Sequence, residues 1–85
     1  MSLFIDVHHI AAKDMDEATA AQLHLQDLAV QDRFGVRYLK YWFDPATGKV
    51  FCLSEAPSSE AVMAVHRASH GFVADEIFTV YEGGG

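Results

Sequence analysis

Apolar positions follow two different spacings along this chain, one typical of strands and one typical of helices. Segments rich in β-branched and aromatic residues predict strands, while apolar positions at helical spacing from Ala18 to Ala29 predict a helix that ends near Arg33. Asp14 or Asp16 can cap this helix, and Gly35 can stop it. We therefore expect two helices, and four strands at residues 3–10, 36–43, 50–55 and 77–81.

Turn-forming residues place these elements in the order β-α-β-β-α-β. Residues 44–48 (DPATG) join the second and third strands into a hairpin, and the second helix extends from a cap at Ser58 to a stop at Gly71. With right-handed crossovers, this order predicts an α+β, ferredoxin-like βαββαβ sandwich: an antiparallel four-stranded sheet of order 4-1-3-2, with both helices on one face. We expect a single domain over residues 1–82 and a flexible glycine tail at residues 83–85.

The chain has more aromatic side chains in its strands than two short helices can cover. They are Phe4, Tyr38, Trp42, Phe51 and Phe78. On the open face of the sheet, such residues would form an exposed apolar patch in a monomer. We therefore predict a homodimer formed through the open sheet face.

Composition narrows the classes of function. Hydrophobic residues make up 51% and charged residues 21% of the 85 positions, which indicates a globular domain. A formal net charge of −6, with only six scattered Lys and Arg residues, argues against nucleic acid binding. No apolar run approaches the ~20 residues of a membrane span, and the first residues lack a signal-peptide pattern. The lone cysteine, Cys52, fits a reducing compartment, so we expect a cytoplasmic protein without membrane contact.

Five histidines are the one compositional excess, and they supply the candidate chemistry. His66 and His70 are four residues apart on one helix face, a spacing that can hold a divalent metal ion. Arg67 stands where the metalloprotease signature has its glutamate, which excludes hydrolysis by that route. We expect both histidines on the flank of the helix rather than in the core. The alternative is a pair of half-exposed surface histidines.

The predicted topology brings further metal-ligand residues toward the same end of the sheet. His8 and His9 are adjacent on a strand and point to opposite faces. His8 lies either in the dimer interface or toward the helices, near His24, and the alternation of the strand fits both. His24 is otherwise a surface histidine. Cys52 is either a small hydrophobic core residue or a thiolate ligand.

Three runs of sequence are similar to those of a known family: HLQDLAVQDRFGVRYLKYWFD, GKVFCLSEAPSSEAV and VHRASHGFVADEI. They resemble a family of small bacterial proteins, long catalogued as a domain of unknown function and now often labelled nickel-binding. The likeness extends from about Phe4 to Val80. It implies a ferredoxin-like homodimer that can bind nickel, without an established enzymatic reaction. Carried over position by position, the polar residues of the family type are Asp6, His8, His24, Asp27, Cys52, His66 and His70.

These observations favour binding over catalysis, because the chain has no glycine-rich phosphate loop, no serine-centred elbow and no second cysteine. We predict a protein that binds a divalent transition-metal ion for sequestration, delivery or sensing. The resemblance favours Ni2+, and Zn2+ or Cu2+ also suit imidazole. One alternative is a small-molecule-binding or enzymatic dimer with a pocket between sheet and helices, and another is a structural or interaction module with incidental histidines. The candidate metal ligands are His8, His24, Cys52, His66 and His70.

Overall fold

The computed structural model describes residues 1–10 and 12–84, which form four strands and two α-helices in the predicted order. Gly85 of the expected glycine tail lies outside the described residues. Two short 3₁₀ helices, η1 (Ala12–Asp14) and η2 (Gln31–Phe34), flank the first α-helix. The main elements are β1 (Ser2–His9), α1 (Glu17–Val30), β2 (Arg37–Asp44), β3 (Lys49–Ala56), α2 (Ser59–Ser69) and β4 (Glu76–Val80).

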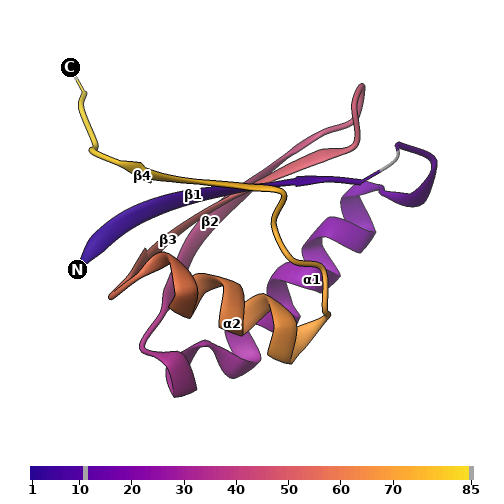
Figure 1. Ribbon diagram of the computed structural model, residues 1–85. Helices are drawn as coiled ribbons and strands as arrows, with labels where there is room; N and C mark the ends of the chain where they lie inside the picture. The colour runs from indigo at the N-terminus through magenta and orange to yellow at the C-terminus, as the bar shows by residue number, and fades with distance from the viewer. Residues whose placement is uncertain (11, 85) are drawn as a thin grey trace.

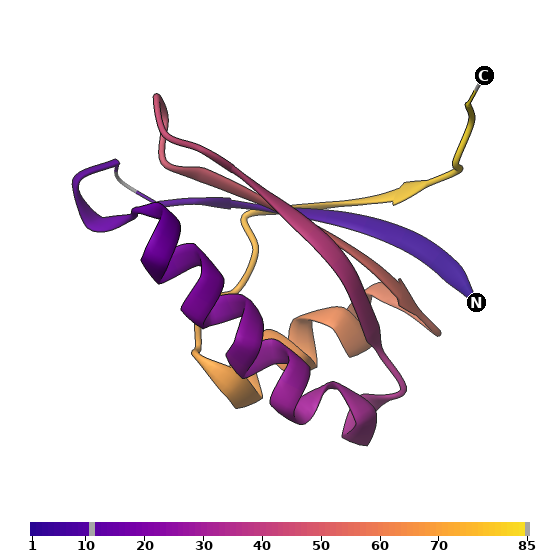
Figure 2. The same cartoon turned by 180° about the vertical axis from the view of Figure 1, so that it is seen from behind.

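The strands form one antiparallel sheet of order β2-β3-β1-β4, which is the predicted order 4-1-3-2 counted from the other edge. Both helices lie beneath the same face of this sheet (Figure 1), and the view from behind shows α1 crossing under it (Figure 2). The predicted α+β, ferredoxin-like fold is confirmed. It places α2 directly against the middle of the sheet, where β1 and β3 pair.

The predicted capping and stop residues are confirmed, although α1 ends at Val30 rather than near Arg33, and η2 follows it. The side chain of Asp16 accepts a hydrogen bond from the Thr19 N–H at 2.7 Å, and Ser58 caps α2 in the same way. Gly35 and Gly71 adopt positive φ angles of 69° and 82° after the helical segments, a conformation that favours glycine. No helix within residues 1–10 and 12–84 has both the length and the apolar character needed to cross a membrane.

The core lies between the helices and the sheet. On β3, every second residue is buried, from Val50 through Cys52 to Ala56. Val62 and Val65 of α2 pack against this face and are fully buried. The same layer contains an unusual number of buried polar side chains, namely Asp6, His8, Asp27, Ser54 and His66. A chain this short has only a small apolar core, and buried polar side chains are unfavourable there unless they are hydrogen-bonded. The partners of these five residues therefore need to be identified.

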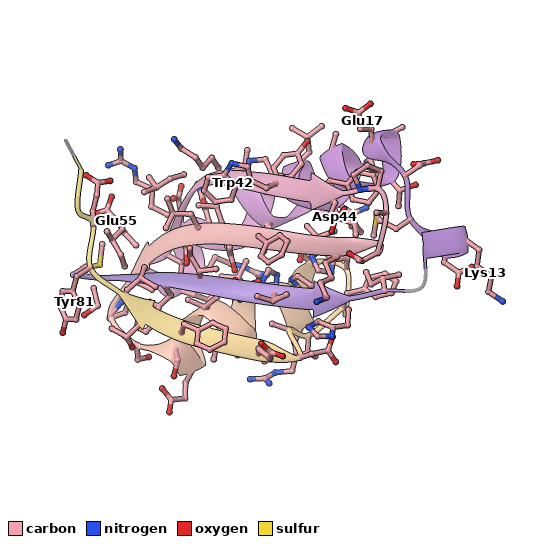
Figure 3. All side chains as sticks on the ribbon, turned by 90° about the horizontal axis from the view of Figure 1, so that it is seen from above. Lys13, Glu17, Trp42, Asp44, Glu55 and Tyr81 are labelled. Carbon is pink, nitrogen blue, oxygen red and sulfur yellow. The ribbon has the colours of Figure 1, made fainter. Side chains whose placement is uncertain are left out.

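The other face of the sheet carries the remaining aromatic residues, as predicted. Phe4 and Tyr38 are buried under the helices, whereas Trp42 and Phe78 are 47% and 50% exposed. Trp42 lies directly across from Phe51 in the register of β2 and β3. Figure 3 looks down on this face, with Trp42 labelled on β2. Within the described parts of the chain, no helix covers it.

Candidate functional site

His66, in α2, is completely buried between two aspartates. Its Nδ1 lies 3.1 Å from Oδ1 of Asp27 in α1, and its Nε2 lies 3.1 Å from Oδ1 of Asp6 in β1. The Tyr38 hydroxyl oxygen is also 3.1 Å from Nε2 and donates its own hydrogen to the Val62 carbonyl at 3.2 Å. Because a carboxylate only accepts hydrogen bonds, both ring nitrogens of His66 act as donors.

Two more histidines extend this arrangement on either side. His8 Nε2 is 2.9 Å from Asp6 Oδ1, and His70 Nε2 is 3.0 Å from Asp27 Oδ1. The result is a continuous chain, His8–Asp6–His66–Asp27–His70, which we call the histidine–aspartate chain. It connects β1, α1 and α2 through side chains alone.

Local structure explains how these side chains meet. Successive residues of a strand point to opposite faces, so Asp6 and His8 both face the helices, while His9 is exposed on the other side. His66 lies in the last turn of α2 and His70 is the C-cap residue one turn later, and both rings reach the carboxylate of Asp27. The open question about His8 is thereby answered, since this residue points toward the helices rather than toward the open sheet face.

The expectation that His66 and His70 lie on a helix flank is wrong. His66 is 0% exposed, and the side chain of His70 is only 4% exposed. Burial of an imidazole is costly unless its nitrogens find partners. Asp6 and Asp27 supply these partners from other elements, so α2 turns its histidines toward the sheet.

The charges of the histidine–aspartate chain follow from this pairing. Burial alone would lower the pKa of His66, but the hydrogen bonds and charges of Asp27 and Asp6 outweigh it and raise this pKa to about 9. Burial likewise opposes ionisation of the two aspartates, yet hydrogen bonds from His66 and from the outer histidines hold the pKa of each carboxyl below its usual value. At neutral pH, His66 is therefore an imidazolium between two carboxylates.

A small pocket lies beside the histidine–aspartate chain, between the sheet and α1. Its volume is about 10 Å3, which is room for a single water-sized body. Its walls contain residues able to bind a metal, namely His8, His24, Asp27, Cys52 and His70. Two groups of such residues have ligand atoms within 4.8 Å of one another, one of Asp6, His8 and Cys52 and one of Asp27, His66 and His70. The structure thus gathers all five candidate ligands into one region, with His24 in the pocket wall.

Two buried imidazole nitrogens in this region lack hydrogen-bond partners among the described residues. They are Nδ1 of His8 and Nδ1 of His24. Burial lowers the pKa of His24, with partial opposition from the charge of Asp27, so this ring is neutral at pH 7. Burial and the nearby carboxylates raise the pKa of the Cys52 thiol. Imidazole nitrogen, thiol sulfur and carboxylate oxygen together suit Ni2+, Zn2+ or Cu2+.

The hydrogen-bond partners that hold the histidines in place are not evident from the sequence. The resemblance includes Asp6 and Asp27 among the polar residues of the family type but not among the candidate ligands, and the sequence marks Tyr38 only as an aromatic strand residue. Asp6 stands two positions before His8 on β1, and Asp27 stands three positions after His24 on α1. This spacing of an acid near a histidine was the available signal for the two aspartates. For the hydrogen bond of Tyr38 to His66, the sequence contained no signal.

The buried imidazolium predicts a specific dependence of stability on pH. The folded-state pKa of His66 lies above its ordinary value of 6.5, so the stability it contributes is fully present below pH 6.5 and is lost as the pH rises through about 9. In a chelating buffer, the free energy of unfolding should fall across this window with a slope approaching ~1.4 kcal/mol per pH unit, the value for one proton. Urea unfolding at a series of pH values measures it.

His9→Gln is the matched control, because His9 is exposed and lies on the opposite face of the same strand. It should leave the slope unchanged. His66→Gln should remove the slope and lower stability, since it leaves two buried carboxylates without a cationic partner. A wild-type protein whose stability is constant between pH 6.5 and 9 would show that His66 is neutral in the folded state.

Comparisons with known proteins identify the family of this chain. The model of the family described as nickel responsive protein SCO4226-like matches residues 4–80. The crystal structure of SCO4226 from Streptomyces coelicolor A3(2) is similar over 98% of this chain and 100% of that chain, with 39% sequence identity and a TM-score of 0.88. No curated protein matches the sequence. Because the family model covers nearly the whole chain, the protein belongs to the SCO4226-like family of nickel responsive proteins.

Proposed function

We propose that this chain binds a divalent transition-metal ion, Ni2+ in the first place, in the pocket between the sheet and α1. The observation that carries the proposal is the buried Nδ1 of His8, a residue of the pocket wall; this nitrogen has no hydrogen-bond partner in the described part of the chain. The ion is cargo or signal rather than a catalytic group, in keeping with sequestration, delivery or sensing. The lone free thiol of Cys52 supports a cytoplasmic location.

The surroundings of His8 match those of a metal ligand. A histidine that binds a metal commonly donates its other ring N–H to a carboxylate, which fixes the ring and its tautomer. His8 donates Nε2–H to Asp6 and leaves Nδ1 available. Asp27 and Cys52 add a carboxylate and a thiol to the same pocket, and a carboxylate offsets part of the charge of the ion. The nickel responsive family supports Ni2+ over other ions that suit this donor set.

The size of this pocket argues against an organic ligand bound within it. A drug-sized ligand occupies several hundred Å3, whereas this pocket encloses about 10 Å3. An ion or a water molecule fits, and an organic substrate does not.

Nickel affinity should depend on pH through the histidines. Protons and metal ions compete for the same nitrogen lone pairs, so affinity should fall as the pH drops below ~6.5. His8→Gln should weaken binding by more than about tenfold, because even residues that only support a metal ligand commonly contribute that much. Isothermal titration calorimetry with NiCl2 at pH 5.5, 6.5 and 7.5 checks both expectations.

The matched control is again His9→Gln, which changes the neighbouring residue on the opposite face. It should bind nickel like the wild type. Cys52→Ser tests the thiol, since a thiolate ligand makes affinity rise further above neutral pH. An affinity that does not change between pH 5.5 and 7.5 would exclude histidine ligands.

The proposed working form is a homodimer through the open sheet face. Supporting it, apolar side chains from all four strands share this face: Leu3, Ile5, Val7, Trp42, Phe51, Leu53, Phe78 and Val80. Trp42 and Phe78 are about half exposed in one chain. An uncovered apolar surface of this kind is rare in a monomer, and a second copy can cover it by a twofold axis.

Sedimentation at micromolar concentration should therefore give twice the mass of one chain. Trp42→Glu places a charge in the proposed interface and should shift the protein to a monomer. Leu25→Glu is the control, because Leu25 is 58% exposed on α1, in the helical layer, and it should remain a dimer. A wild-type protein that sediments as a monomer would contradict the proposed interface.

A further inference from the structure

The four histidines among the candidate ligands differ in one respect that decides their roles, namely whether a buried ring nitrogen is left without a hydrogen-bond partner. We propose that His8 and His24 bind the ion, and that His66 and His70 position them without contacting it. This inference rests on the metal-binding function proposed above and assigns the ligands of the same site.

Both histidines of α2 have their ring nitrogens fully engaged. His66 donates through Nδ1 to Asp27 and through Nε2 to Asp6, and its ring is 0% exposed. Nε2 of His70 donates to Asp27 at 3.0 Å, while its Nδ1 accepts the Phe72 N–H at 3.0 Å. Binding a metal through His66 would first break a buried hydrogen bond and leave its carboxylate partner unsatisfied. Binding through His70 would break either its contact with Asp27 or the exposed hydrogen bond from the Phe72 N–H.

The histidines of β1 and α1 are in the opposite situation. His8 is 4% exposed and its Nε2 is held by Asp6, so Nδ1, which finds no hydrogen-bond partner among the described residues, is the nitrogen left to bind an ion. Nδ1 of His24 is also buried, and no hydrogen-bond partner for it occurs in residues 1–10 or 12–84. Both rings line the pocket, together with Cys52. An ion in this pocket would satisfy two buried polar atoms that lack partners among the described residues.

The HxxxH spacing of α2 therefore serves a supporting role. His66 fixes the carboxylate of Asp6, which in turn fixes the ring and tautomer of His8. His70 fixes Asp27 in the pocket wall. The ion then joins β1 to α1, and α2 keeps its hydrogen bonds whether or not the ion is bound.

Histidine ring NMR tests this assignment directly. Long-range 1H–15N spectra of the intact 15N-labelled protein are recorded first in a chelating buffer and then with increasing Zn2+, a diamagnetic divalent ion. We expect one nitrogen each of His8 and His24 to move to a metal-bound position. Both nitrogens of His66 should stay protonated, and those of His70 should keep their unbound pattern. His8→Gln and His24→Gln identify the two responding rings, and His9→Gln is the control that should change neither.

Three results are possible, and each one is decisive. Zinc-dependent shifts confined to His8 and His24 support the assignment. A zinc-bound nitrogen on His66 or His70 overturns it but leaves the proposed metal-binding function intact. If no histidine responds to Zn2+, and NiCl2 added to a second sample causes no paramagnetic broadening, the metal-binding function fails and the assignment fails with it.

Discussion

The hydrogen bonds of His66 to Asp6 and Asp27 are the interaction on which the rest of the site depends. Three charged groups lie in the core of a small domain, and each would be costly there without its partners. The two aspartates belong to β1 and α1, and the histidine belongs to α2, so correct pairing requires all three elements in register. These buried contacts therefore fix the positions of α1 and α2 on the sheet more precisely than a small apolar core could alone.

The same pairing gives the pocket its chemistry. Two carboxylates and one imidazolium leave a net negative charge beside a space that fits one ion. One carboxylate oxygen of Asp6 and one of Asp27 each lie within hydrogen-bond distance of two histidines. The same contacts therefore hold the core together and orient the histidine rings. A carboxylate that orients a ligating histidine is a recurrent feature of metal sites, and here it also connects the site to the packing of the domain.

Sequence patterns predicted the fold well because its determinants are local. Asp16, Ser58, Gly35 and Gly71 mark the helical segments through their own neighbours. The sequence supplies the candidate ligands but not their arrangement in the folded chain. Because both faces of β1 carry apolar residues, the sequence does not show which face of the sheet the side chain of His8 points to. The burial of His66 depends on Asp27 and Asp6, which are 39 and 60 residues away and become its neighbours only in the folded chain.

The central claim is that this core holds a metal ion, and the metal content of the protein tests it most directly. Untagged protein would be purified from cells grown with added nickel, passed through gel filtration without chelator and analysed for bound elements. The account predicts that nickel stays with the wild-type protein in a fixed ratio to the chain and is lost from His8→Gln. Wild-type protein that emerges free of nickel and of every other transition metal would contradict it.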